Sequence, residues 1–200
     1  IAMQRPGSVS GRFEFEGGPP ADLNPTMVRF MPMPADPGSS RFMMTSPPQT
    51  NPDYSFRGQG FLGLVLLRAS APPGWYLASI HHGADDVTDV PVRLEPGTDV
   101  RDLRILFTRT ATTLSGTVRD DRGNPVVDAT VVVFPDDDQR WTFGSRHLRT
   151  LRPDTQGRFE TRGLPPAANY RIVAVQGLED GQGYDPEFLS GVRDRADRLA

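Results

Sequence analysis

The clearest pattern of hydrophobic and polar positions lies in the second half of the chain. Polar and apolar residues alternate from Thr113 to Val118, a polar segment follows at residues 120–125, and residues 129–134 form a run of mostly β-branched residues. Alternation with period two predicts a strand with one exposed face, and a continuous β-branched run predicts a strand buried on both faces. Further strands are predicted over residues 147–151, 158–161 and 170–176, with a turn over residues 153–157.

The first half repeats this order imperfectly. Strand-like segments at residues 8–15, 27–33, 60–67 and 71–80 correspond to those of the second half, at a spacing of roughly 100 residues, the size of a small β-sandwich. The first half ends with predicted strands over residues 90–94 and 100–107. The second half instead has an Asp-Pro pair at Asp185 and Pro186, which predicts a short helix to about residue 195.

These patterns predict an all-β chain of two tandem antiparallel β-sandwiches and a short helix near the C-terminus. The first domain spans residues 1–109 and includes a Pro- and Met-rich loop over residues 31–53. The second spans residues 110–200 and lacks its last strand, so that one sheet edge is left open. Because the chain begins at Ile1 rather than Met, we expect a processed protein or a piece of a longer one.

Composition supports this class of protein and excludes several activities. The chain has 20 Gly and 20 Pro, in keeping with many turns between short strands. All 22 basic residues are Arg, which excludes lysine Schiff-base chemistry, and the absence of Cys excludes thiol catalysis. A net charge of -3 with scattered Arg residues argues against a nucleic-acid partner. No apolar run reaches the ~18 residues of a membrane span.

Five short motifs carry a family resemblance. They are Leu-Ser-Gly-Thr-Val at residues 114–118, Gly-Asn-Pro-Val at 123–126, Val-Val-Val-Phe at 131–134, Gly-Arg-Phe at 157–159 and Leu-Pro-Pro at 164–166. With them the second half resembles carboxypeptidase regulatory-like domains, which are transthyretin-like (prealbumin-like), Ig-like β-sandwiches. The first half matches more loosely. The resemblance implies a bacterial protein in an extracellular, cell-surface or periplasmic location, and says little about activity, because such modules occur in many kinds of protein.

Two groups of side chains are candidates for a metal site, and each also has a structural explanation. Met31, Met33, Met43 and Met44 flank the Pro-rich loop, and their thioethers with the imidazole of His81 would suit Cu(I). The alternative is that these Met residues fill an irregular edge of the first sandwich. The acids at residues 85–89 and 136–138 follow no calcium-loop spacing and are expected in turns. His81, His82 and His147 have no metallopeptidase spacing and are expected on the surface at strand ends.

Three aromatic residues are candidates for a carbohydrate platform. Trp141 and Phe143 lie in the long segment before His147, where loops of such sandwiches carry recognition, and Trp75 begins a strand. Ordinary packing in the core is the alternative for both Trp residues.

The sequence thus predicts a non-catalytic structural or adhesive module with no cofactor and no catalytic residue. Its expected partner is protein, through self-association or the rest of a longer chain, and strand donation into the open edge would build a filament. The alternatives are a carbohydrate- or metal-binding module, or an accessory domain of a larger peptidase or receptor.

Overall fold

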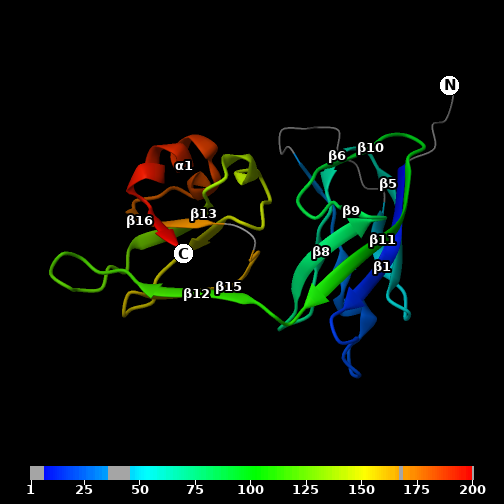
Figure 1. Ribbon diagram of the computed structural model, residues 1–200, viewed down its shortest axis with the longest axis horizontal. Coiled ribbons are helices and arrows are strands. Elements are labelled where there is room, and N and C mark those ends of the chain that lie inside the picture. Colours follow the sequence, from blue (N-terminus) through cyan, green and yellow to red (C-terminus); the bar gives the residue numbers. More distant parts are fainter. Residues whose placement is uncertain (1–6, 36–45, 167–168, 200) are drawn as a thin grey trace. The chain divides into compact units, whose positions relative to one another are not determined.

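The computed structural model describes residues 7–35, 46–166 and 169–199. The chain forms two compact units, Ile1–Thr110 and Ala111–Ala200. Both units consist mainly of β-strands, and the single α-helix of the described residues lies near the C-terminus (Figure 1), so the all-β prediction is confirmed. None of the helices in the described residues is long and apolar enough to span a membrane.

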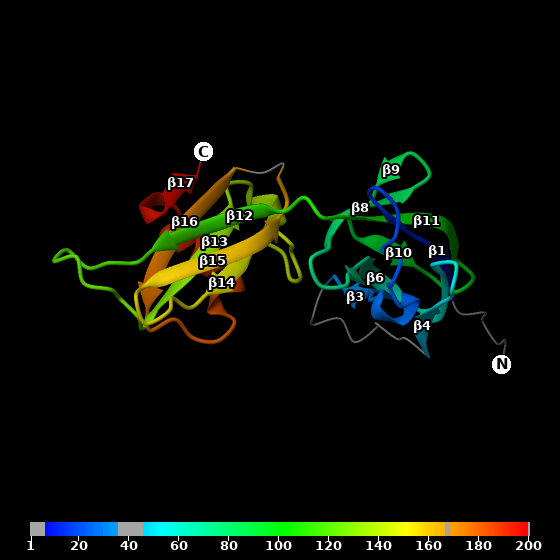
Figure 2. The ribbon, with the colours of Figure 1, turned by 90° about the horizontal axis from the view of Figure 1, so that it is seen from below.

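The first unit contains a six-stranded sheet in the order β4-β5-β1-β11-β8-β9, a three-stranded sheet in the order β10-β6-β3, and the short pair β2-β7. Figure 2 shows these strands from a second direction. Their bounds are β1 (Gly7–Phe15), β2 (Arg29–Phe30), β3 (Met33–Pro34), β4 (Ser46–Thr50), β5 (Ser55–Phe61), β6 (Gly63–Leu66), β7 (Ala69–Ser70), β8 (Tyr76–His82), β9 (Asp85–Asp86), β10 (Val92–Leu94) and β11 (Asp99–Thr108), with a 3-10 turn η1 (Pro25–Met27).

Strand β1 is central to the first unit because it has a partner on each edge. It pairs antiparallel with β5 and parallel with β11. Its alternating residues Val9, Phe13 and Phe15 point into a core of stacked and tilted aromatic rings, with Phe13 4.9 Å from Phe56 and 5.8 Å from Phe107 between ring centroids. The period-two pattern therefore places one face of β1 in the core.

The strand predicted over residues 27–33 is wrong. Asn24 caps the 3-10 turn η1 by accepting a hydrogen bond from the backbone amide of Thr26, and only the two-residue strands β2 and β3 follow. The physical reason is proline, which lacks the backbone donor that a continuous ladder needs and recurs here at Pro25, Pro32 and Pro34.

The second unit contains a two-stranded sheet, β12-β15, and a four-stranded sheet in the order β14-β13-β16-β17. The run of β-branched residues predicted to be buried on both faces is β13, whose residues Val131, Val132, Val133 and Phe134 are at most 1% exposed. The bounds are β12 (Thr112–Thr117), β13 (Ala129–Pro135), β14 (Arg149–Leu151), β15 (Arg158–Leu164), β16 (Tyr170–Gln176) and β17 (Asp197–Leu199), with 3-10 turns η2 (Asp138–Arg140), η3 (Gln182–Tyr184) and η4 (Arg193–Arg195) and the helix α1 (Pro186–Val192).

Two Asp-led turns connect strands of the second unit as predicted. Asp154 accepts hydrogen bonds from the backbone amides of Gln156 and Arg158, at 2.8 and 2.9 Å. Gly157 follows with φ of 75°, a conformation that favours glycine. Asp120 makes the equivalent bonds in the turn after β12.

The end of the chain is partly as predicted. Asp185 caps α1 and Pro186 is its first residue, and the 3-10 turn η4 directly follows the helix and ends at Arg195. Strand β17 was not predicted; it pairs antiparallel with β16.

The two units differ in how their later strands pair. In the first unit β8 pairs with the closing strand β11, whereas in the second unit the corresponding β16 pairs with β13. The antiparallel partner of β1 is β5, whereas the repeat predicted the segment at residues 60–67 for this position. That the two units are tandem copies of the same sandwich therefore remains a proposal.

Candidate functional site

One edge of β12 is the most distinctive feature of the second unit. Strand β12 pairs with β15 along its other edge, and the amide of Val118 continues that ladder by donating to the carbonyl of Gly157 at 2.8 Å. Because antiparallel pairs alternate, Leu114 and Gly116 also direct their backbone groups toward β15. Those of Thr113, Ser115 and Thr117 therefore point to the opposite edge, where no strand in the described part of the chain pairs with them.

Strand β1 of the first unit provides an internal reference for this edge. Both strands contain a Ser-Gly pair, and both are joined to an antiparallel partner in the same register: Gly11 lies opposite Phe56, and Gly116 lies opposite Phe159. In the first unit the second edge is occupied by β11. The amide of Ser8 donates to the carbonyl of Thr98 at 2.8 Å and that of Glu16 to Phe107 at 2.9 Å.

The presence or absence of this third strand changes the burial of the equivalent side chains. Val9, Phe13 and Phe56 are 0%, 2% and 2% exposed in the first unit. Their counterparts in the second unit are only half-buried; they are Leu114, Val118 and Phe159. The hydrophobic layer under β12 is therefore incompletely covered on the side where β11 lies in the first unit.

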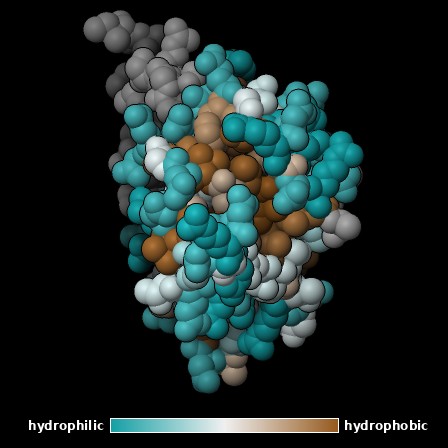
Figure 3. Space-filling view, turned by 90° about the vertical axis from the view of Figure 1, so that its left-hand side faces the viewer, coloured by the Kyte–Doolittle hydropathy of each residue, from teal (hydrophilic) through white to brown (hydrophobic). Residues whose placement is uncertain are grey.

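Half-buried apolar side chains gather in the layer to which β12 belongs. Figure 3 shows apolar side chains in the middle of one face, surrounded by polar ones. In the cluster that includes β12, four residues are fully buried, and the residues packed against them are half-buried. These half-buried residues are Leu114, Val118, Leu151, Phe159, Ile172 and Leu199.

A charged cluster links the four-stranded sheet of the second unit to the C-terminal segment. The guanidinium of Arg171, whose residue is 7% exposed, donates to the carboxylate of Asp136 at 2.6 Å and to the carbonyl of Arg193 at 2.7 Å. Arg193 in turn donates to the backbone carbonyl of Asp136 at 2.8 Å. The cluster thus joins the ends of β13 and β16 to η4, and so holds the C-terminal segment on the sheet.

Several carboxylates of the second unit have a lowered pKa. The hydrogen bond from Arg171 lowers the pKa of Asp136 below its ordinary 3.8, against a smaller opposing effect of desolvation. The pKa of Asp120 is lowered first by the side chain of Asn124, and that of Asp154 first by the backbone amide of Arg158. All three groups therefore favour the charged form in the folded state.

We expect the second unit to lose stability in acid. A carboxyl group whose pKa is lower in the folded state stabilises the fold above its unfolded value, here 3.8, and this contribution disappears as the pH falls through the folded value. The urea concentration at the unfolding midpoint should therefore decrease when the pH is lowered below about 4. Asp136→Asn should lower the midpoint near neutral pH and reduce the further drop in acid. An unchanged acid response in this variant would contradict the assignment.

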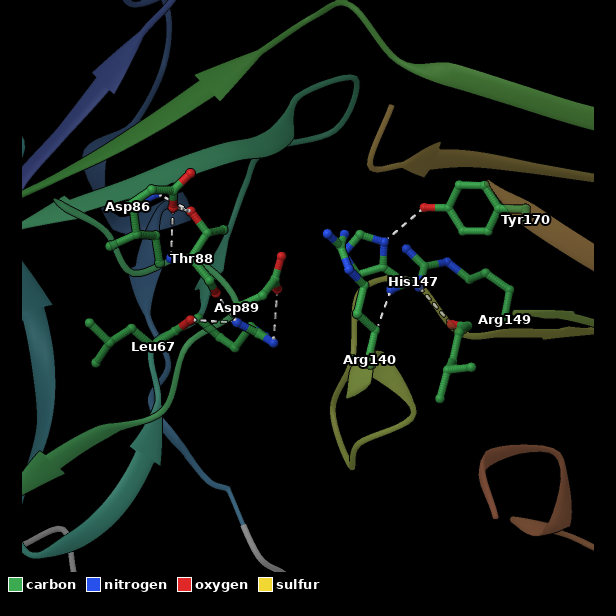
Figure 4. Close-up of polar contacts among 12 residues, drawn as sticks. Leu67, Asp86, Thr88, Asp89, Arg140, His147, Arg149 and Tyr170 are labelled. Carbon is green, nitrogen blue, oxygen red and sulfur yellow. Dashed lines mark hydrogen bonds and ion pairs between the residues drawn. The ribbon is translucent and has the colours of Figure 1, made fainter. Parts of the chain in front are cut away.

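His147 is buried rather than on the surface, which corrects the expectation from sequence. The residue is 1% exposed, and Figure 4 shows its ring between Tyr170 and Arg140. Because the Tyr170 hydroxyl donates to the carbonyl of Pro165 at 2.8 Å, it accepts from Nδ1 of His147 at 3.0 Å, and Nε2 accepts from Arg140 at 3.2 Å. The ring is thus a hydrogen-bonded part of the core.

The candidate carbohydrate residues are not brought together as one exposed platform. Trp141 is 6% exposed, and its indole nitrogen donates to the carbonyl of Pro135 at 2.8 Å. Trp75 is 8% exposed and packs edge-on against Phe15 in the core of the first unit. Phe143 is 47% exposed. Neither Trp side chain is therefore largely open to solvent, as stacking on a sugar requires.

The candidate copper residues lie on different elements of the first unit. Met33 belongs to β3 and is half-buried, and Met31 is 54% exposed. His81 lies on β8 of the other sheet, opposite Asp86 of β9. Met43 and Met44 lie outside the described residues. No group of three or more His, Asp or Glu side chains suited to a metal occurs in the part of the chain that the structure describes.

The acidic candidates for calcium have local partners. Asp86 accepts hydrogen bonds from the amide and the hydroxyl of Thr88. Burial opposes the charged form of Asp86, but these bonds prevail and lower its pKa. Asp137 caps η2 and bonds to Arg140. These carboxylates therefore stabilise the turns in which they lie by accepting local hydrogen bonds.

The sequence predicted an open edge in the second sandwich but did not identify its residues. The signal was available in the Ser-Gly pair that β1 and β12 share, because it marks the two strands as equivalent and so points to the edge of β12 that corresponds to the β11 side of β1. The edge of Thr113, Ser115 and Thr117 is therefore the candidate functional site, as a surface for a protein partner.

Comparisons with solved structures give low similarity over most of the chain. The Bacillus anthracis TIE protein is 10% identical, with 86% of this chain covered, 28% of that chain and a TM-score of 0.29. A streptococcal ancillary pilin is 13% identical, with 86% and 54% covered and a TM-score of 0.34. A variant of the shaft pilin SpaA from Lactobacillus rhamnosus GG is 11% identical, with 88% and 89% covered and a TM-score of 0.34.

The present chain therefore spans about a quarter of the first of these proteins and about half of the second. No curated protein matches the sequence. The family model of the carboxypeptidase regulatory-like domain matches residues 113–193, which lie within the second unit. The resemblance predicted from the motifs of the second half is thus confirmed: residues 113–193 match the model of the carboxypeptidase regulatory-like domain.

Proposed function

We propose that this chain is a non-catalytic structural module of a bacterial extracellular, cell-surface or periplasmic protein, and that β12 accepts a strand from a protein partner. The observation that carries the proposal is the unpaired edge of β12 beside half-buried apolar side chains. An added strand would satisfy the free backbone groups and cover the apolar layer together.

An open edge is a surface that proteins rarely leave without protection. Natural edge strands are protected by charged side chains, proline, bulges or a covering segment, since otherwise they pair with other chains. The residues of β12 are Thr112, Thr113, Leu114, Ser115, Gly116 and Thr117, with no charge and no proline among them. The ladder to β15 is irregular at the start of β12, between Thr112 and Thr113, so the segment from Thr113 to Thr117 is the part without charge, proline or bulge.

Two sources of the added strand are compatible with this role. A neighbouring subunit would extend the assembly and build a filament, because a donor on one surface and an acceptor on another form a head-to-tail contact. Further residues of the same polypeptide would instead close the sheet within one molecule. An accessory role in a larger peptidase or receptor corresponds to the second source.

Ser115→Pro tests the neighbouring-subunit form of the proposal without disturbing the ladder to β15. The Ser115 amide faces the open edge, so proline removes a donor that β15 does not use. We expect the purified wild-type chain to self-associate in light scattering and to form filaments in electron microscopy, and Ser115→Pro to remain monomeric with an unchanged circular dichroism spectrum. A wild-type chain that stays monomeric at high concentration would reject filament formation through β12.

A further inference from the structure

We infer, on the basis of the proposed strand-accepting role, that the partner strand runs parallel to β12 and has apolar residues at alternate positions. The proposed occupant is an extended segment of another polypeptide whose chemistry resembles that of β11. The pattern required is apolar, any residue, apolar, with the first apolar residue opposite Gly116 and the second opposite Val118.

The requirement follows from the pairing of β1 with β11. Their ladder is parallel and places Leu103 opposite Gly11, Ile105 opposite Phe13, and Phe107 opposite Phe15. The three β11 side chains are each 0% exposed. They therefore supply the cover that Val9, Phe13 and Phe56 have and that their counterparts in the second unit lack.

A glycine at the equivalent position is compatible with the close approach of such a strand. A Cβ atom at Gly11 would lie 2.3 Å from the carbonyl oxygen of Leu103 and 2.7 Å from its Cβ, so β11 can pack here only against glycine. Gly116 keeps this position free of a side chain in β12. The tip of the Phe159 ring lies over this position, 2.6 Å from where a Cβ atom would stand, so an apolar residue opposite Gly116 approaches as closely as Leu103 approaches Gly11 once that ring turns aside.

Strand β11 of this chain cannot itself pair with β12, because its core-facing residues are completely buried in the first unit. A synthetic peptide with the sequence of β11, Asp99–Thr108, is nevertheless a suitable probe of the chemistry. In the full chain the edge of β1 that pairs with β11 is already occupied, so β12 is the acceptor that this inference names, and binding at another sheet edge would not respond to Ser115→Pro. A matched control peptide carries Leu103→Ser and Ile105→Ser, which removes the apolar pattern and keeps the charges.

The experiment is a titration of the full chain with each peptide, followed by fluorescence anisotropy and by NMR. We expect the β11 peptide to bind at least about tenfold more tightly than the serine control, and Ser115→Pro to weaken its binding by a similar factor. A nitroxide on the peptide N-terminus should broaden the NMR signals of Thr112 and Thr113, and one on the C-terminus those of Thr117 and Val118. The opposite pattern would show an antiparallel strand.

The outcomes separate this inference from the proposed function. Equal binding of both peptides, or an antiparallel orientation, would overturn the partner chemistry. If the β11 peptide does not bind while the chain assembles in a manner sensitive to Ser115→Pro, the acceptor role stands and the parallel apolar partner is wrong. If neither peptide binding nor assembly occurs, the parallel apolar partner and filament formation through β12 are both wrong.

Discussion

Trp141→Ala is expected to destabilise the second unit by about 3–5 kcal/mol, the usual cost of removing a large buried aromatic side chain. The ring is 6% exposed and lies edge-on to Phe134, with 5.7 Å between ring centroids. The guanidinium of Arg193 lies 5.7 Å from the ring centre. The substitution therefore opens a cavity in the core, leaves the carbonyl of Pro135 without its indole donor, and removes a contact of the charged cluster.

Phe143→Ala is the matched control because it lies two residues away in the same segment and is 47% exposed. A change within about 0.5 kcal/mol is expected there. Differential scanning calorimetry can follow both units, and in Trp141→Ala the remaining fluorescence of Trp75 reports on the first unit alone. A loss below about 1 kcal/mol for Trp141→Ala would mean that the ring is not a core residue, and would make it available again for carbohydrate recognition.

Gly11→Ala is expected to destabilise the first unit by about 3 kcal/mol, at the upper end of the cost of overpacking. The new methyl group would lie 2.3 Å from the carbonyl oxygen of Leu103, an atom of the β11 backbone that the parallel ladder holds in place. Relief requires β1 and β11 to separate, which would disturb the ladder and the buried residues Leu103 and Ile105 together. Thermal or urea unfolding, with Trp75 fluorescence as the readout, measures the effect.

Gly116→Ala provides the control at the equivalent position of the second unit. Its methyl group would meet the tip of the Phe159 ring at 2.6 Å, and this ring is half-buried and belongs to a side chain that can move. We expect a loss below about 1 kcal/mol. Equal losses in the two variants would show that Gly116 is packed as tightly as Gly11, and would contradict an open edge at β12.

The elements that the sequence predicted well carry their signals locally. Strand β16 has the predicted bounds, and β13 extends only one residue beyond its β-branched run. The start of α1 follows from Asp185 as its cap and Pro186 as its first residue. In each case the residues that determine the structure lie within one element, so a single sequence is sufficient to read them.

The features that the sequence did not reveal depend on contacts between distant segments. Trp141 and His147 lie in a polar segment typical of a surface loop, but their partners Pro135 and Tyr170 are on β13 and β16. Strand β17 has only three residues and is defined by its pairing with β16. Likewise, the pairing of β8 with β11 in one unit and of β16 with β13 in the other leaves no trace in the local alternation.

The parallel ladder between β1 and β11 has a mechanical consequence. These are the first and last strands of the first unit, joined over seven residue pairs. Tension applied to the two ends of this unit pulls parallel neighbours in opposite directions, so that their hydrogen bonds are loaded in shear and must break together. Strand β17 pairs with β16 over three residues in antiparallel fashion, with Leu199 opposite Tyr170, and tension on its end would peel it away one pair at a time. Under load, the C-terminal strand should therefore detach first while the first unit remains folded.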